Sequence, residues 1–303
     1  MLRLEHTGGL ELDSTLDCGQ CFRWSRTPAG WAGVVDGRSV LARMEGDTLL
    51  LEGPDETERD FWSRYFALDV DYPALLARYQ AGNRRLAACV AENPGIRVLR
   101  QPFFETLCTF ILSQNNNIPR IRGLVERLCA LCGSPLENGQ HAFPTPEQLA
   151  ACTEEQLATL RAGWRAGYLA DATQKVLGHL PGPEALTALP LADAQAALMT
   201  IHGVGPKVAD CTLLYGLGRW DAFPLDVWMK RAMAQLFPRG IPVCCRGTQG
   251  IAQQFIFAYA RAHLPKGETP KQAGAGPPAG RNERQPHIQC TPPHGRNRRR
   301  LFF

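Results

Sequence analysis

The stretch IHGVGPKVADC, residues 201–211, decides how this chain folds. Gly203 and Gly205 flank a valine, and glycine permits the positive φ that a sharp backbone reversal needs. Pro206 follows, with its φ preset for a first helical turn and no amide to leave unpaired. The pattern predicts helix, hairpin, helix. Amides at such a turn can bind a backbone phosphate without reading sequence, although an ordinary tight turn is the alternative.

Lys207 lies alone among apolar neighbours in the first turn of the expected second helix. The positive end of the helix dipole disfavours an ammonium there, so the free amine is favoured. A free amine can attack an electrophilic carbon and form a Schiff base. Cys211 follows four residues later, hence on the same helix face. A solvating lysine and a small core thiol are the alternatives.

Other polar residues near helix ends are also candidates for chemistry. Asp226, in FPLDVWMK, is placed as the N-cap of an apolar helical run. A carboxylate there could stabilise positive charge on a sugar carbon beside Lys207, although capping alone is the alternative. The run SQNNNIPRIRG contributes Asn115 and Arg120, and RAGWRAGYL contributes Arg165. Such groups can hydrogen-bond base edges, but a polar loop and a surface arginine are equally compatible.

The sequence predicts three parts with different patterns. Residues 1–100 contain strand-like runs, up to about residue 80, between Gly and Asp turns. Residues 101–264 show helical periods. The predicted fold is therefore α+β, with an N-terminal antiparallel β-sheet domain followed by an all-helical helix-hairpin-helix domain. Residues 265–303, with seven prolines, five glycines and the run RNRRR, are expected to be a disordered basic tail.

Charge and cysteine usage bound the function. Of 33 Lys/Arg and 29 Asp/Glu, eight and two lie from Pro265 onward, which leaves 25 and 27 in the first 264 residues. Any DNA affinity must therefore come from a local patch and backbone donors. No signal peptide or long apolar run is found, which indicates a cytoplasmic protein without a membrane span. The eleven cysteines are expected to be reduced, and neither CGQC nor CALC has the second half of a zinc site.

Taken together, these motifs resemble a known family. HGVGPKVADC followed by PLDV looks like the helix-hairpin-helix DNA glycosylases, and SQNNNIPRI, GQCFRW and AQQFIF look like the 8-oxoguanine DNA glycosylases. The similarity covers about residues 10–264. It implies a monomeric enzyme without cofactor or metal that flips 8-oxoguanine out of double-stranded DNA, cleaves its glycosidic bond and nicks the strand by β-elimination. Such an enzyme works in the cytoplasm, or in the nucleus of a eukaryote.

The resemblance also implies roles for single residues. Lys207 matches the lysine that attacks the sugar C1′, and Asp226 the aspartate that supports the charge. Gly19 of GQCFRW matches the glycine whose carbonyl accepts the N7 hydrogen that 8-oxoguanine has and guanine lacks. Gln253 matches a glutamine that reads the Watson–Crick edge. Two further residues match those that contact the faces of the base: Phe257 and Cys211.

Contacts to the rest of the DNA are implied in the same way. Three residues match those that fill the gap and read the orphaned cytosine: Asn115, Arg120 and Arg165. Arginine can only donate, and cytosine offers two acceptors at its pairing edge. Gly203 and Gly205 match the hairpin glycines. Trp228 departs from the pattern, because the animal enzymes have a phosphate-contacting histidine there, and an indole carries no charge.

Three rival interpretations stay open at this point. A noncatalytic helix-hairpin-helix DNA-binding module needs the glycines but neither Lys207 nor Asp226. An alkylbase glycosylase manages with the aspartate and a water nucleophile. An enzyme resembling endonuclease III usually carries iron–sulfur cysteines, and no four-cysteine run follows Asp226.

Overall fold

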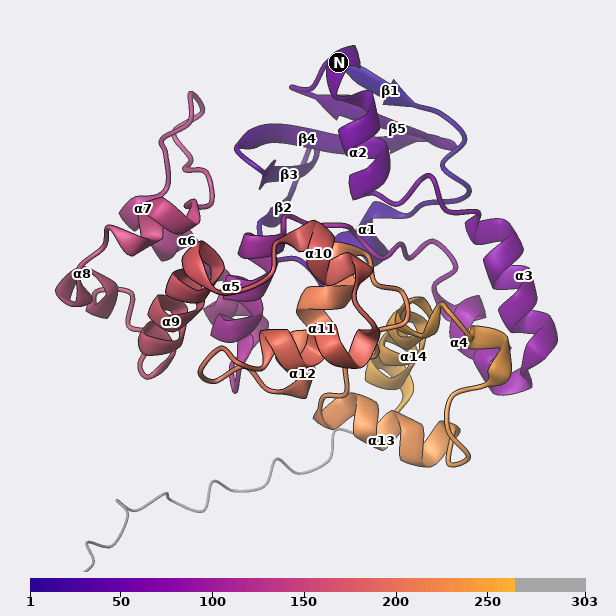
Figure 1. Ribbon diagram of the computed structural model, residues 1–303. Helices are drawn as coiled ribbons and strands as arrows, with labels where there is room; N and C mark the ends of the chain where they lie inside the picture. The colour runs from indigo at the N-terminus through magenta and orange to yellow at the C-terminus, as the bar shows by residue number, and fades with distance from the viewer. Residues whose placement is uncertain (265–303) are drawn as a thin grey trace, which may run out of the picture. The chain divides into compact units, whose positions relative to one another are not determined.

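The computed structural model describes residues 1–264, which form one compact unit. A five-stranded antiparallel sheet occupies one end of this unit and helices fill the rest (Figure 1). The predicted α+β fold is therefore confirmed. No helix in residues 1–264 is long and apolar enough to cross a membrane. The predicted tail, residues 265–303, lies outside the described residues.

The sheet has the strand order β1-β5-β4-β3-β2, and every neighbouring pair is antiparallel. Its strands are β1 (Leu2–Leu4), β2 (Trp24–Thr27), β3 (Gly30–Val35), β4 (Arg38–Glu45) and β5 (Thr48–Glu52). Trp24 and Trp62, the latter on α2 (Arg59–Tyr65), both pack against the ring of Phe66. These aromatic residues and α1 (Leu12–Leu16) cover one face of the sheet and form with it a separate hydrophobic core.

The sheet is shorter than the sequence pattern predicts. Its last strand ends at Glu52, and the chain then forms α2, α3 (Tyr72–Gly82) and α4 (Arg84–Glu92). Local capping explains the difference. The Asp71 carboxylate accepts a hydrogen bond from the Ala74 amide at 2.9 Å and so begins α3, while the Asn83 side chain begins α4. Both helices join the core of the helical region.

The second half of the chain is helical. Its longer helices are α5 (Phe103–Ser113), α6 (Ile118–Cys132), α9 (Arg165–Gly178), α11 (Leu191–Leu198), α13 (Val227–Leu236) and α14 (Gln249–His263). Its shorter ones are α7 (Pro146–Ala150), α8 (Glu154–Ala158), α10 (Pro183–Ala188) and α12 (Pro206–Cys211), which continues into a π-helical turn, η2 (Thr212–Gly216). The run TPEQLAACTEEQLATL forms two short helices, α7 and α8, because Thr153 starts the second with a capping box to Gln156.

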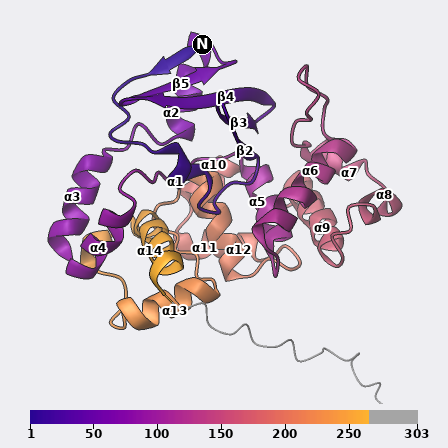
Figure 2. The same ribbon diagram turned by 180° about the vertical axis from the view of Figure 1, so that it is seen from behind.

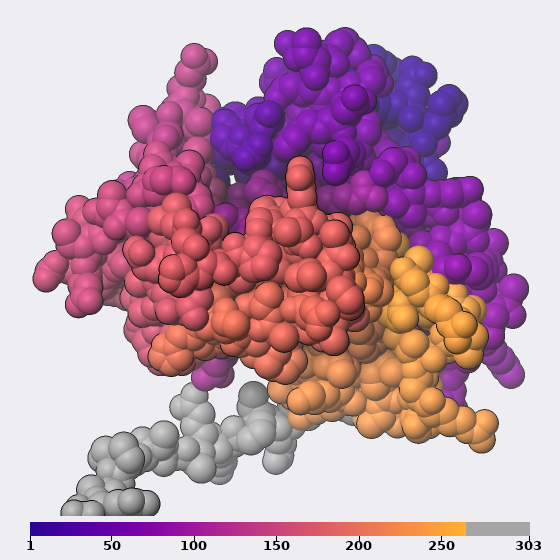
Figure 3. Space-filling model, in the orientation of Figure 1, coloured from indigo at the N-terminus to yellow at the C-terminus, as the bar shows by residue number. Residues whose placement is uncertain are grey.

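The last described helix, α14, packs both on α13 and on α4, which is far from it in the sequence. In both ribbon views α14 lies below α1, with α13 beneath it (Figure 2), and α13 and α14 pack directly on each other. The space-filling view shows the N-terminal region seated on the helical region (Figure 3). Phe22 belongs to the helical core and Leu99 to the sheet core, so the chain crosses between the two. The loop carrying Gly19 is therefore held over the helices.

Candidate active site

The hairpin lies between α11 and α12 and depends on its two glycines for different reasons. Gly203 has a φ of 79°, and a Cβ there would lie 2.1 Å from the ring of Tyr168 on α9. Gly205 has a φ of −100° and open space around it. Of the two glycines, only Gly203 therefore uses the positive φ that glycine permits, and Gly205 begins α12 without a side-chain cap. Its missing Cβ leaves the first amides of α12 approachable.

A cleft of about 710 Å³ opens at the start of α12 and α13. Five of the residues singled out from the sequence line it: Asn115, Arg120, Gly205, Lys207 and Asp226. Ser113 and Lys230 line it as well. Arg120 and Lys230 outnumber the carboxylate of Asp226, so this cleft supplies the local positive patch that the first 264 residues lack in their overall charge.

Lys207 lies in the first turn of α12, as predicted. Its side chain is half-buried, and its Nζ donates a hydrogen bond to Ser113 Oγ at 3.3 Å. The same nitrogen lies 4.8 Å from the centroid of the Phe110 ring. Phe110 and Ser113 are three residues apart on α5 and share one face of it. Neither residue was singled out from the sequence; the available signal was the three-residue spacing between Phe110 and Ser113, the first residue of SQNNN.

Asp226 is the N-cap of α13, as predicted. Its Oδ1 accepts a hydrogen bond from the Met229 amide at 2.7 Å, and the residue is half-buried in the cleft wall. Trp228 lies in the first turn of the same helix, with the guanidinium carbon of Arg231 6.0 Å from its ring. A cation therefore lies beside this indole.

The three asparagines of SQNNN differ in their roles. Asn117 caps α6 by accepting a hydrogen bond from the Arg120 amide at 3.0 Å. Asn116 donates from its side chain to the carbonyl of Leu112 at 2.8 Å. Asn115 is exposed and has a φ of 51°, a left-handed conformation that few residues other than glycine adopt. Such backbone geometry is concentrated at functional sites, and here it accompanies a side chain that lines the cleft.

Arg165 lies behind this loop and does not line the cleft. Only 5% exposed, it donates from Nε to the carbonyl of Gln114 at 2.8 Å and from Nη2 to that of Asn115 at 3.3 Å. Its guanidinium also lies 4.1 Å from the centroid of the Trp164 ring. Burial lowers the pKa of Arg165, and the positive charge of Arg120 lowers it further. In this structure Arg165 therefore fixes the loop that presents Asn115.

Two of the residues matched to base recognition flank the cleft. Gly19, in the loop between α1 and β2, has a φ of 88°, and a Cβ there would lie 3.9 Å from Ile118 Cδ1 on α6. Cys211 is buried at the end of α12. Burial raises the pKa of its thiol to about 11, although the charge of Lys207 opposes the shift. Cys211 is therefore an uncharged thiol at neutral pH.

The other two lie on α14. Gln253 is only 4% exposed, and its Nε2 donates a long hydrogen bond of 3.4 Å to the carbonyl of Pro224. Its Oε1 is buried without a partner among residues 1–264, which is a costly arrangement for an amide oxygen and fits one that receives a ligand. Phe257, one turn later, lines a separate hollow together with Cys18. The four base-recognition residues thus come from three elements and do not line the cleft itself.

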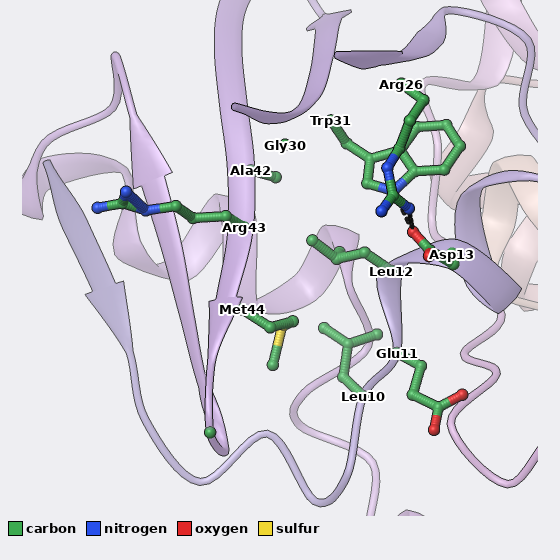
Figure 4. A pocket seen from close by; sticks show the side chains of 11 residues that line it. Leu10, Glu11, Leu12, Asp13, Arg26, Gly30, Trp31, Ala42, Arg43 and Met44 are labelled. Atoms are coloured by element: carbon green, nitrogen blue, oxygen red, sulfur yellow. Dashed lines mark hydrogen bonds and ion pairs between the residues drawn. The ribbon is translucent and has the colours of Figure 1, made fainter. Parts of the chain in front are cut away.

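A second hollow, of about 440 Å³, lies in the sheet region and is not part of this site (Figure 4). Leu10, Leu12, Trp31 and Met44 line it. Asp13 accepts hydrogen bonds from Trp31 Nε1 at 2.7 Å and from Arg26. None of the residues singled out from the sequence lies among those lining it, so it does not compete with the cleft as the candidate active site.

Comparisons with known proteins agree with this arrangement. The 8-oxoguanine DNA glycosylase N-terminal domain matches residues 2–107, and the HhH-GPD superfamily base excision DNA repair protein matches residues 108–240. An N-glycosylase/DNA lyase of Saccharomyces cerevisiae is 31% identical in an alignment of 250 positions that covers 73% of this chain and 66% of that protein. The chain therefore spans about two thirds of the length of this curated relative.

Two solved structures match a larger share of this chain than the curated relative does, at higher sequence identity. A structure of MBOgg1 in complex with a low affinity DNA ligand has 38% identity and a TM-score of 0.79, over 86% of this chain and 94% of that one. The 8-oxoguanine glycosylase/lyase of Clostridium acetobutylicum, in complex with DNA that contains cytosine opposite 8-oxoguanine, has 33% identity and a TM-score of 0.77, over 84% and 92%.

Proposed function

The chain belongs to the 8-oxoguanine DNA glycosylases of the helix-hairpin-helix superfamily, and on that premise we propose that it excises 8-oxoguanine opposite cytosine and nicks the strand. It acts as a bifunctional glycosylase and AP lyase in base excision repair. One observation carries the proposal: a single cleft holds an amine at Lys207, a carboxylate at Asp226, and base-edge donors at Asn115 and Arg120. A noncatalytic module has no use for the first two.

The chemistry follows from the amine and the carboxylate. The damaged nucleotide leaves the stack, because its sugar carbon is unreachable inside the duplex. Lys207 Nζ attacks C1′, and the electron pair of the glycosidic bond leaves with the base. Loss of the amine proton and ring opening give a Schiff base, which acidifies the C2′ proton; its loss expels the 3′ phosphate. Asp226, fixed by the Met229 amide, stabilises the positive charge on the sugar.

Recognition of the lesion falls to the residues behind the cleft. The carbonyl of Gly19 accepts the N7 hydrogen that distinguishes 8-oxoguanine from guanine. Gln253 Oε1, buried without a partner in the described part of the chain, accepts from the pairing edge of the purine. Phe257 stacks on one face of the base, and the uncharged Cys211 thiol meets the other.

The remaining DNA contacts are made by the loop and the hairpin. Asn115 and Arg120 reach the orphaned cytosine from the cleft, and Arg165 holds the loop of Asn115 in place. Gly203 and Gly205 present the hairpin amides to a backbone phosphate. We place residues 1–100 as the sheet-bearing part and 101–264 as the catalytic part of a monomer. It works on chromosomal DNA in the cytoplasm, or in the nucleus of a eukaryote.

Borohydride trapping tests the proposal. Wild-type protein and Lys207→Gln are incubated with duplexes that carry either 8-oxoguanine or guanine opposite cytosine, and covalent complexes are counted after reduction. We expect a complex only with the lesion and only with Lys207. Base release that survives Lys207→Gln would instead indicate the water-using alkylbase mechanism. DNA binding without base release or trapping would indicate the noncatalytic module.

A further inference from the structure

A chain of buried hydrogen bonds joins the three elements that the proposed function assigns to the base. It begins at the loop of Gly19 and passes through Gln20 and Gln101 to Tyr215 in η2, the turn that follows Cys211. The proposed catalytic residues, Lys207 and Asp226, take no part in this series of hydrogen bonds. Its members fix backbone groups rather than line the cleft.

Gln20 fixes the position of the residue that follows Gly19. Its side chain is 1% exposed, and its Nε2 donates to the carbonyls of Thr15 at 2.9 Å and Arg97 at 2.8 Å. Its Oε1 accepts from the Leu99 amide at 2.9 Å. These three bonds tie the side chain to two different segments, so residue 20 has little rotational freedom.

Gln101 connects this loop to the helical region. Its side chain Nε2 donates to the backbone carbonyl of Gln20 at 2.7 Å, and its own amide donates to the carbonyl of Tyr215 at 2.7 Å. The hydroxyl of Tyr215 in turn donates to Gln254 Oε1 at 2.8 Å, next to Gln253 on α14. The loop, η2 and α14 are thereby held at fixed separations.

The direction of the Gly19 carbonyl depends on this support. Gly19 has a φ of 88°, in a region of backbone conformation that glycine alone adopts without strain. The conformational freedom of glycine means that Gly19 by itself does not fix the peptide plane that it shares with Gln20. The restraint comes from the Gln20 side. We propose that Gln101 is a positioning residue for lesion discrimination, which holds Gln20 and hence the Gly19 carbonyl at the distance that the N7 hydrogen requires. This inference rests on the proposed function.

Gln101→Glu is the sharpest test, because it keeps the size of the side chain and the backbone amide while removing the donor to Gln20. Single-turnover rates are measured on a duplex with 8-oxoguanine opposite cytosine and on one with a preformed abasic site. Nicking at the abasic site needs Lys207 but no base recognition. We expect excision to slow about tenfold or more, as for a buried hydrogen bond left unmade, and nicking to change by less than about twofold.

Two further variants show whether a loss of stability alone could account for a lower ratio of excision to nicking. Gln101→Leu removes the donor without adding a charge and is expected to lower the same excision-to-nicking ratio. Thr173→Val removes a buried hydroxyl that bonds the Leu169 carbonyl within α9, and is expected to leave the ratio unchanged. Urea unfolding of each variant records its stability.

The possible outcomes distinguish a failure of the proposed function from a failure of the proposed role of Gln101. Wild-type protein that excises no 8-oxoguanine overturns both the proposed function and this inference. Active wild type with an unaltered ratio in Gln101→Glu overturns this inference alone. Equal losses of excision and nicking would show that Gln101 merely supports the fold, which also overturns it.

Discussion

The amine of Lys207 and the hydroxyl of Ser113 lie 3.3 Å apart, although 94 positions separate them in the chain. This contact joins the last residue of α5 to the first turn of α12. The hydroxyl gives a long, flexible side chain one preferred direction in the cleft. A lysine that attacks a sugar carbon benefits from such restraint, because a nucleophile held near its target loses less entropy in the reaction.

Ser113→Ala is therefore expected to slow formation of the trapped Schiff base by about three- to tenfold, the effect of losing one partly buried hydrogen bond. DNA binding should change little, because the cationic side chains of Arg120 and Lys230 remain in the cleft. Trapping rates and binding to a guanine duplex measure the two effects separately. Ser25→Ala, which alters an exposed serine of β2, is the control. An unchanged trapping rate would mean that the hydroxyl does not orient Lys207.

The two hairpin glycines should respond differently to alanine. Gly203→Ala forces a left-handed φ on a residue with a Cβ and drives that Cβ into Tyr168, so we expect a loss of at least about 2 kcal/mol in the free energy of unfolding. Gly205→Ala meets no atom within 4 Å and should leave stability nearly unchanged. It should still weaken binding to undamaged duplex, because the methyl group obstructs the phosphate. Urea unfolding and binding titrations check both; equal stability losses would refute the distinction.

Gly19→Ala tests the proposed reading of the lesion. The added Cβ finds space, since its nearest neighbour is Ile118 Cδ1 at 3.9 Å, but the φ of 88° is strained for alanine and should shift the carbonyl. We expect excision of 8-oxoguanine to fall by about tenfold or more, with nonspecific DNA binding nearly intact. Excision assays and binding to a guanine duplex provide the comparison. Parallel loss of both would count against the role of Gly19.

Glu105 should make stability depend on pH. The residue lies on α5 with a buried Oε2 that has no partner within residues 1–264, and burial raises its pKa to about 7 while Arg23 opposes the shift. The folded state therefore holds a proton that the unfolded state releases from about pH 4.5 upward. The free energy of unfolding therefore falls by about 3 kcal/mol as the pH rises from about 4.5 to 7, and it stays at the lower value above pH 7.

Glu105→Gln removes this titration. Relative to wild type, the variant should gain stability between pH 5 and pH 8 by an amount on the order of 3 kcal/mol. Urea unfolding at the two pH values measures the gain. A difference between variant and wild type that is the same at both pH values would show that Glu105 does not titrate in this window.

The sequence by itself determined the elements whose causes are local. Pro206 starts α12 and Asp226 caps α13, because a preset φ and a carboxylate within three residues of its amide act over a single turn. The same holds for the order of sheet and helices, which follows from periods of two and of 3.6 residues. Short-range signals were also present at Asp71 and Asn83, whose side chains cap α3 and α4 in a region where the strand pattern overestimated the sheet.

Only the tertiary structure decided which distant groups meet. Ser113 reaches Lys207, Tyr168 requires Gly203 to be a glycine, and Gln101 joins the Gly19 loop to η2. Arg165, which the sequence marks only as an arginine beside a tryptophan, turns its guanidinium to the carbonyls of the loop. These contacts depend on how whole helices pack, because each joins segments that no local pattern relates. Packing is a property of the assembled core, so neither the spacing nor the type of these residues predicts it.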